Sequence, residues 1–153
     1  MSSSLLINIS NDATSTIVTL SGRIDEDSHF DAITSSSADV FIFDFENVTL
    51  INSCGVREWI NLVNTIIKKS KIIYRHCPQI MIEQMNMVQG FLPEGATIES
   101  FYAPYFDPDQ DKEVKILISL SEVTGKKAPV KNNEKGTELE FDALEAQYFN
   151  FIK

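Results

Sequence analysis

The sequence predicts an α/β fold, a single-layer mixed β-sheet of about five to six strands with helices packed on one side. Strand-like apolar runs alternate with segments whose apolar residues recur at helical spacing, a pattern typical of crossover units. The run Asp39–Asn47 has four apolar residues in succession, Val40 to Phe43, and predicts a strand at the centre of a covered sheet. The connections between the predicted strands and helices are short, which favours one compact layer of helices on the sheet.

The elements follow in order along the chain. A loop with a short helix is expected after Gly22, and a helix after Asn52, where Trp59 belongs to a stripe facing the core. A further helix follows Pro78, which suits a first turn. Strands are predicted over Leu5–Ser10, Ser15–Gly22, Asp39–Asn47, Lys71–Cys77, from about Thr97, and over Glu113–Ser121; the later helix is predicted over Gln79–Val88.

Composition divides the chain into a domain over residues 1–121 and a C-terminal extension over 122–153. Residues 122–140 are polar, with two glycines and a proline, and predict a linker or mobile loop. The last residues predict a short amphipathic helix whose apolar face needs a partner. That face would hold Phe141, Leu144, Tyr148 and Ile152.

Charge and composition exclude several classes of function. A net charge of −9 argues against nucleic acid as a partner, since binding it rests on neutralising phosphates. We expect no direct membrane insertion, because no run of about 18 apolar residues exists. The N-terminus lacks the features of a secretory signal. Two cysteines are too few for a disulfide framework and suit no zinc site, which favours a reducing cytoplasm.

No motif predicts a cofactor or a metal. Glycine-rich phosphate loops are absent from the sequence. The acidic run from Asp107 resembles the start of a calcium loop, but Lys112 and Ile118 occupy the positions that need glycine and glutamate. A solvated acidic turn between strands is the preferred interpretation. Phe101–Phe106 and the methionines of 81–87 are read as core, with a partner-binding surface as the alternative.

The junction "VTLINSCGVREWI", Val48–Ile60, is the most informative stretch, because ligands meet α/β sheets at the carboxyl ends of strands. In one interpretation Asn52 or Ser53 caps the helix, and Gly55 lets another group approach closely. In a second, Cys54 or Cys77 is the nucleophile of a thiol-dependent or hydrolytic enzyme. That enzyme would need a base, and the only histidines, at positions 29 and 76, lie in no recognisable catalytic motif.

A third interpretation makes Ser53 a phosphoacceptor. The first-turn N–H groups and the positive end of the helix would tolerate a phosphate there. The phosphate would still add roughly −2 charge to a loop that a partner contacts. Such a modification would act on association rather than on folding.

Two segments resemble the STAS domain family, named for sulfate transporters and anti-sigma-factor antagonists. "VTLSGRID" matches its first strand, which ends in Leu-x-Gly-x-Leu/Ile-Asp. "DVFIFDFENVTLINSCGVREWINLV" matches the central strand with aspartate near its end, a short apolar link, Asp-Ser-Ser/Thr-Gly and a helix. The resemblance covers about residues 5–119. The matching residues are Leu20, Gly22, Ile24, Asp25, Asp44, Val48, Ile51, Ser53 and Gly55.

This resemblance implies a small mixed sheet with helices on one side and a non-enzymatic module that binds proteins. In bacterial anti-sigma-factor antagonists the serine at the position of Ser53 is phosphorylated by a partner kinase, which is also the anti-sigma factor. The chain departs from the family pattern in having Asn52 for the usual aspartate and Cys54 for the second small hydroxyl residue. Arg57, Glu58 and Trp59 also stand where small or aliphatic residues are common.

We therefore expect a cytoplasmic module that acts in signal transduction and transcription regulation. Its partner would be an anti-sigma factor with serine kinase activity, and Ser53 its phosphoacceptor. The alternative within the same family is a subunit of a membrane transporter that docks on the ATPase. The residues expected to bind the partner are Asp25, Asn52, Ser53, Cys54, Gly55, Arg57, Glu58 and Asn61.

Overall fold

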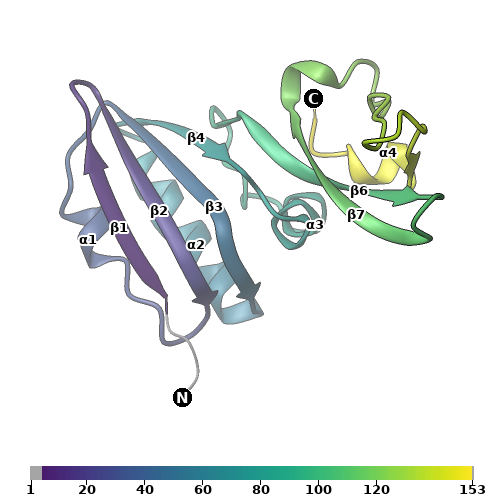
Figure 1. The fold of residues 1–153 in the computed structure, drawn as a ribbon. Coiled ribbons are helices and arrows are strands. Elements are labelled where there is room, and N and C mark those ends of the chain that lie inside the picture. The colour runs from purple at the N-terminus through teal and green to yellow at the C-terminus, as the bar shows by residue number, and fades with distance from the viewer. Residues whose placement is uncertain (1–4, 153) are drawn as a thin grey trace.

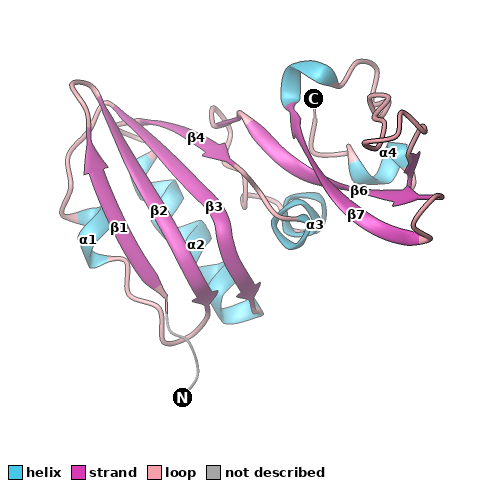
Figure 2. Ribbon diagram, in the orientation of Figure 1, coloured by secondary structure: helices cyan, strands magenta, loops and turns pink. Residues whose placement is uncertain are grey.

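A computed structural model describes residues 5–152 and has a mixed α/β fold with two separate sheets. Figures 1 and 2 show a larger sheet formed by the N-terminal half and a smaller one formed by the C-terminal half. The strands of the larger sheet are β1 (Leu6–Asn11), β2 (Ser15–Ile24), β3 (Val40–Ile51), β4 (Lys71–Arg75) and β5 (Thr97–Ile98). Those of the smaller sheet are β6 (Ser100–Asp107), β7 (Lys112–Ser119) and β8 (Glu140–Phe141).

In the larger sheet the strands lie in chain order, β1-β2-β3-β4-β5. β1 is antiparallel to β2, and every later pair is parallel. Crossovers that all advance in one direction place their helices on the same face when each is right-handed. Figure 1 shows α1 and α2 together behind β1–β3, as the sequence predicts. The helices are α1 (Asp31–Thr34), α2 (Ser53–Ile66), α3 (Gln79–Met87), α4 (Glu145–Tyr148) and the 3₁₀ turn η1 (Leu120–Glu122).

The core under α2 is an aromatic cluster. Phe43 and Phe45 alternate along β3 toward the helices and meet the edge of Trp59 at centroid distances of 5.0 and 5.4 Å. Tyr74 of β4 lies 5.0 Å from Phe45. All four side chains have no solvent exposure. Such edge-to-face pairs add to the large burial of each ring, so this cluster fixes α2 on the sheet.

The two polar groups in this cluster bond to each other. Trp59 Nε1 donates to the Tyr74 hydroxyl at 3.0 Å, and that hydroxyl donates to the carbonyl oxygen of Phe91 at 2.7 Å. Burial raises the pKa of Tyr74, which keeps the hydroxyl protonated and able to donate. The chain of bonds therefore ties α2, β4 and the segment after α3 together without leaving a buried donor unpaired.

The prediction of one sheet is wrong for the C-terminal strands. The strand expected from Thr97 pairs with β4 for only two residues. From Ser100 the chain pairs instead with β7 on one side and β8 on the other, and both pairings are antiparallel. β6 is buried on both faces. Segments far away in the sequence, including Phe149 and Phe151, pack against it. The local pattern that predicts a strand carries no information about which sheet it joins.

The predicted C-terminal helix is also largely wrong. α4 has only four residues, Phe141 lies in β8, and Leu144 is 72% exposed. The buried side chains are those of Tyr148, Phe149 and Phe151. The rings of Phe149 and Phe151 meet Phe101 of β6 at 6.1 and 5.3 Å. Packing of these two aromatics against β6 prevails over the helical spacing of the apolar residues.

The polar stretch before β8 contacts the second sheet, rather than forming the expected mobile loop. The Tyr105 hydroxyl donates to the carbonyl oxygen of Pro129 at 2.6 Å. The Ala128 N–H donates to Glu145 at 2.6 Å, and Lys131 pairs with Glu122 at the same distance. These bonds hold residues 128–131, near the middle of the stretch, and tie them to Glu122 at its start.

None of the helices described between residues 5 and 152 has the length and apolar character needed to cross a membrane.

We predict that Tyr74→Phe lowers the free energy of unfolding by about 2 kcal/mol, because it leaves Trp59 Nε1 and the Phe91 carbonyl buried without a partner. Urea denaturation followed by fluorescence measures the change. The matched control is Tyr102→Phe, whose hydroxyl bonds the exposed Glu46 and should cost less than about 1 kcal/mol. Equal losses in the two variants would contradict a structural role for the buried hydroxyl.

Candidate functional site

The candidate site lies where β3 ends and α2 begins. Asn52 caps α2: its side-chain oxygen accepts a hydrogen bond from the Gly55 N–H at 2.8 Å. The cap predicted for Asn52 or Ser53 is therefore made by Asn52. Ser53 is the first residue of the helix and is exposed to solvent. Its hydroxyl is thus available at the predicted strand-to-helix junction, and the cap does not use it.

Gly55 allows the first turn of α2 to contact the backbone after β2. A Cβ on Gly55 would lie 2.2 Å from the carbonyl oxygen of Ile24 and 3.0 Å from the amide nitrogen of Asp25. The Asn52 N–H donates to the same Ile24 oxygen at 3.2 Å. Because β2 and β3 are parallel neighbours, their carboxyl ends bring these two segments together. The predicted close approach is therefore a backbone contact between the two loops of the site.

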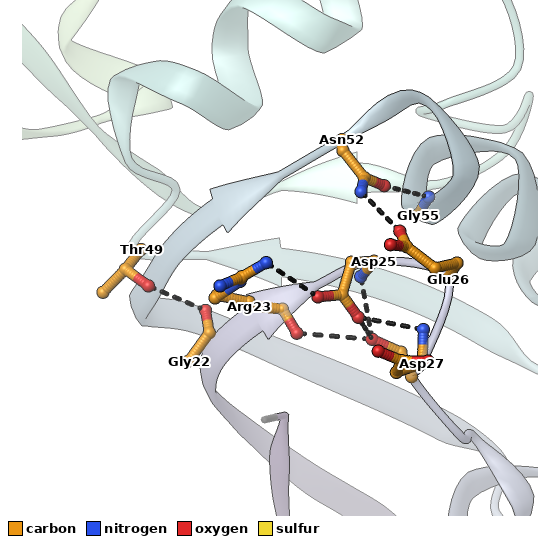
Figure 3. Close-up of polar contacts among 9 residues, drawn as sticks. Gly22, Arg23, Asp25, Glu26, Asp27, Thr49, Asn52 and Gly55 are labelled. Carbon is orange, nitrogen blue, oxygen red and sulfur yellow. Dashed lines mark hydrogen bonds and ion pairs between the residues drawn. The ribbon is translucent and has the colours of Figure 1, made fainter. Parts of the chain in front are cut away.

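The loop after β2 is a turn built around Asp25 (Figure 3). The Asp25 carboxylate accepts from the Asp27 N–H at 3.0 Å, and the Asp25 N–H donates to the Ser28 hydroxyl at 2.9 Å. Arg23 pairs with the same carboxylate at 3.3 Å. Asp25 is only 7% exposed, so its carboxylate stabilises the loop through these internal hydrogen bonds. The exposed carboxylates that a partner would meet here belong to Glu26 and Asp27.

A hydrogen bond joins the two loops at the surface. Asn52 Nδ2 donates to Glu26 Oε2 at 2.7 Å while its oxygen caps the helix (Figure 3). This bond is the main cause of the lowered pKa of Glu26, and the nearby Arg23 contributes less. An aspartate at position 52 could cap the helix but could not donate to Glu26. With the aspartate of the STAS pattern at position 52, two carboxylates would repel each other here. Asn52 instead forms a hydrogen bond with Glu26.

Glu26 is a site residue that the sequence analysis did not identify. It is 26 positions from Asn52, and no local pattern links the two residues. The sequence contains only an indirect signal that Glu26 belongs to the site. Glu26 follows the aspartate of the first matching segment, and neighbouring parallel strands bring their carboxyl ends together.

The remaining predicted contact residues lie on the first turns of α2. Arg57, Glu58 and Asn61 are exposed, whereas Cys54 is half-buried and Gly55 is buried. The Arg57 guanidinium lies 3.7 Å from Cys54 Sγ. A partner at this surface would therefore meet Ser53 and these three polar side chains beside Glu26 and Asp27.

The structure does not favour Cys77 as a nucleophile. Its thiol is fully buried, and burial, with a smaller effect of Asp44, raises its pKa well above the ordinary value. His76 Nδ1 instead lies 3.0 Å from Asp44 Oδ2 and donates to that carboxylate, and His29 is exposed. No hydrogen bond joins either cysteine to a histidine in the part of the chain that is described.

The other predicted surfaces are mostly core. Phe101 and Tyr105 are buried in β6, and Met81 is buried in α3, although Met87 is 71% exposed. The acidic turn after β6 is exposed at Asp109 and Asp111, as the sequence predicts. Asp107 is buried, and Asn133 Nδ2 donates to Asp107 at 3.0 Å and to Asp109 at 2.8 Å.

Comparison with models of known protein families finds no match. Comparison with curated proteins also finds none.

We predict that Gly55→Ala lowers the free energy of unfolding by more than about 2 kcal/mol. Alanine favours a helix by about 1 kcal/mol, but its methyl group would overlap the Ile24 carbonyl. Thermal or urea denaturation tests this. Ser53→Ala, on the same turn but exposed, should change stability by no more than about 0.5 kcal/mol. A Gly55→Ala protein as stable as the wild type would contradict the tight contact between the loops.

We predict that Asn52→Asp raises the pKa of Glu26 and reverses the sign of the Glu26 contribution to the pH dependence of stability. In the wild type the lowered pKa of Glu26 contributes stability above its unfolded value, which is lost as pH falls through the folded pKa. In the variant two carboxylates repel each other at neutral pH, so its deficit should shrink on acidification. NMR titration of the Glu26 carboxyl and urea midpoints against pH measure both effects. Asn64→Asp, exposed on α2, adds the same charge away from Glu26 and should leave the Glu26 pKa unchanged.

Proposed function

We propose that this chain is a STAS-like protein-interaction module switched by phosphorylation of Ser53. The observation that carries the proposal is the exposed Ser53 hydroxyl on the first turn of α2, beside a loop bonded to the same turn. The partner surface consists of Ser53, Glu26, Asp27 and the exposed α2 side chains of Arg57, Glu58 and Asn61. Asn52, Gly55 and Asp25 hold that surface in shape.

The geometry favours a switch that changes binding and leaves the fold intact. Asn52 already caps α2, so Ser53 can be modified without removing the cap. A phosphate would add roughly −2 charge next to the exposed carboxylates of Glu26 and Asp27. A partner fitted to the unmodified surface would then face a much more negative one, and its affinity would fall.

The STAS-like assignment rests on sequence motifs and is supported by the arrangement of the larger sheet. An antiparallel first strand, parallel strands after it and helices on one face match the small mixed sheet that the resemblance implies. The two matching motifs lie at neighbouring strand ends and meet through Gly55 and Ile24. The second sheet is additional to what the resemblance implies.

The partner that this proposal implies is an anti-sigma factor that is also a serine kinase. Such a system would place the chain in the cytoplasm, in the regulation of transcription. The two free cysteines suit a reducing compartment. The module itself would catalyse no reaction, and the kinase would supply the phosphoryl transfer.

The test is affinity capture from the native cytoplasm with three forms of the chain: wild type, Ser53→Ala and Ser53→Asp. We expect wild type and Ser53→Ala to retain a serine kinase identified by mass spectrometry, and Ser53→Asp to lose at least about tenfold in affinity. Ser35→Asp, an exposed serine after α1, is the matched control and should bind like wild type. The kinase and ATP should label wild type but not Ser53→Ala.

Equal capture by the Ser53→Ala and Ser53→Asp forms, with no labelling, would reject the switch. Capture of a transporter ATPase instead would point to the alternative STAS-like role. No specific partner in any form would reject the interaction module itself.

A further inference from the structure

A groove runs along one side of α3, the helix that lies between the two sheets and contacts β3, β6 and α4 (Figure 1). It consists of two hollows with volumes of about 440 and 530 Å³, and both are lined by Gln79 and Glu83. We call the two hollows together the α3 groove. Because they adjoin at shared residues, they form one elongated depression along the helix.

Apolar side chains lie at both ends of the α3 groove. The hollow between α3 and α4 is lined by Met87 and Leu144, which are 71% and 72% exposed. The hollow between α3 and β3 is lined by Val48, Ile80 and Tyr102. Single exposed apolar residues are ordinary, but two that face one hollow leave apolar area that a bound side chain would cover. The flexible side chain of Met87 can adapt to the shape of such a group.

Hydrogen bonds hold the walls of the groove together without a ligand. Asn86 Nδ2 donates to the carbonyl oxygen of Tyr148 at 2.9 Å, which joins α3 to α4. The Tyr148 hydroxyl donates to the carbonyl oxygen of Tyr102 at 2.6 Å, which joins α4 to β6. Burial raises the pKa of Tyr148, so its hydroxyl stays protonated and able to donate. A ligand would therefore meet a groove that is already formed, which reduces the entropic cost of binding.

The end of the α3 groove near α4 has an excess of negative charge. Glu83 lines it, and Asp142 directly precedes the lining residue Ala143. The lysine in the groove, Lys115, pairs with Glu113 at 2.5 Å. None of the ion pairs described between residues 5 and 152 involves Glu83 or Asp142. Two carboxylates therefore remain without a cation beside the exposed apolar side chains.

The carboxylates near α4 also affect one another. The pKa of Asp142 is raised, mainly by its hydrogen bond with Glu113, whereas the bond with Lys115 lowers the pKa of Glu113. At the opposite end of the groove, Glu46 accepts a hydrogen bond from the Tyr102 hydroxyl at 2.6 Å and lies 3.9 Å from His76. A cationic ligand would thus gain most at the end that holds Asp142.

Charge and apolar surface together select the occupant. Nucleic acid or an acidic peptide would be repelled by the carboxylates. A metal ion would use the carboxylates but would leave Met87 and Leu144 uncovered. A peptide segment with aliphatic or aromatic side chains between lysines or arginines satisfies both features. The elongated shape along a helix also suits such a segment, as in other grooves that bind amphipathic peptides.

We propose that the α3 groove binds a basic amphipathic segment of a partner protein. An aliphatic or aromatic side chain of the segment covers Met87 and Leu144, and its lysines or arginines pair with Glu83 and Asp142. The groove is a second binding site, separate from the Ser53 surface at the start of α2. Its use requires no phosphorylation.

Selection from a phage library of random peptides of about 12 residues, with the full chain as target, tests the proposal. We expect the selected peptides to combine a net positive charge with leucine, isoleucine or aromatic residues. Fluorescence polarisation of labelled copies should give a Kd on the order of 1 to 100 µM. Glu83→Lys and Leu144→Ser should each weaken binding at least about tenfold, because they remove an ion pair and an apolar contact.

Matched controls come from exposed residues of the larger sheet. Asp39→Lys, just before β3, also replaces a carboxylate with a lysine, and Leu6→Ser on β1 replaces a leucine that is 68% exposed. Both should bind the selected peptides like the wild type. All four positions are exposed, so the variants should fold, which circular dichroism would verify.

NMR and salt provide independent readouts. Binding of a selected peptide should shift the methyl signal of Met87 and lower the pKa of Asp142, because a nearby cation favours the ionised carboxylate. Affinity should fall severalfold between low and high salt as the charges are screened.

Several results would overturn the proposal. They are a library that yields no binding peptide, selected peptides without net positive charge, and affinities unchanged by Glu83→Lys and Leu144→Ser. Self-association of the chain that Leu144→Ser abolishes would identify a second copy as the occupant and would also overturn it. None of these measurements involves a kinase or Ser53, so their failure leaves the Ser53 proposal standing.

Discussion

The contact between Gly55 and the backbone at Ile24 is the constraint on which the site and the larger sheet depend. It joins the first turn of α2 to the loop after β2 with no side chain between them. The contact sets how deeply α2 sits at the carboxyl end of the sheet. Trp59, one turn farther along, then lies over Phe43 and Phe45. A displacement of the first turn would disturb both the aromatic core and the surface around Ser53.

Two hydrogen bonds beside this contact come from the same side chain, that of Asn52, and each has a different role. The oxygen of Asn52 satisfies the helix terminus, and its nitrogen holds Glu26. The exposed surface is therefore organised by bonds that do not use Ser53. This division explains how Ser53, next to the cap, is free for modification, although a serine at the start of a helix often makes the cap itself.

Much of the larger sheet could be predicted because its signals are local. Asp39–Asn47 is strand-like by composition, Asn52 is a strong cap, and the stripe including Trp59 has helical spacing. The second sheet could not be predicted, because β6 pairs with β8 across more than thirty residues of chain. Likewise Phe141 to Ile152 has helical spacing, yet Phe149 and Phe151 pack beside Phe101 by contacts that no local pattern specifies. At the site, the cap and the glycine were predictable, whereas the bond from Asn52 to Glu26 required the folded chain.

The late position of Phe149 and Phe151 affects how the chain folds during synthesis. The larger sheet is complete in sequence by Ile98, so it can assemble while the remainder is still being translated. β6, in contrast, is covered by the rings of Phe149 and Phe151, which leave the ribosome only well after β6 itself. Until then its apolar residues and unpaired edge remain accessible to other chains. The nascent protein therefore passes through a stage in which chaperones have a defined strand to protect.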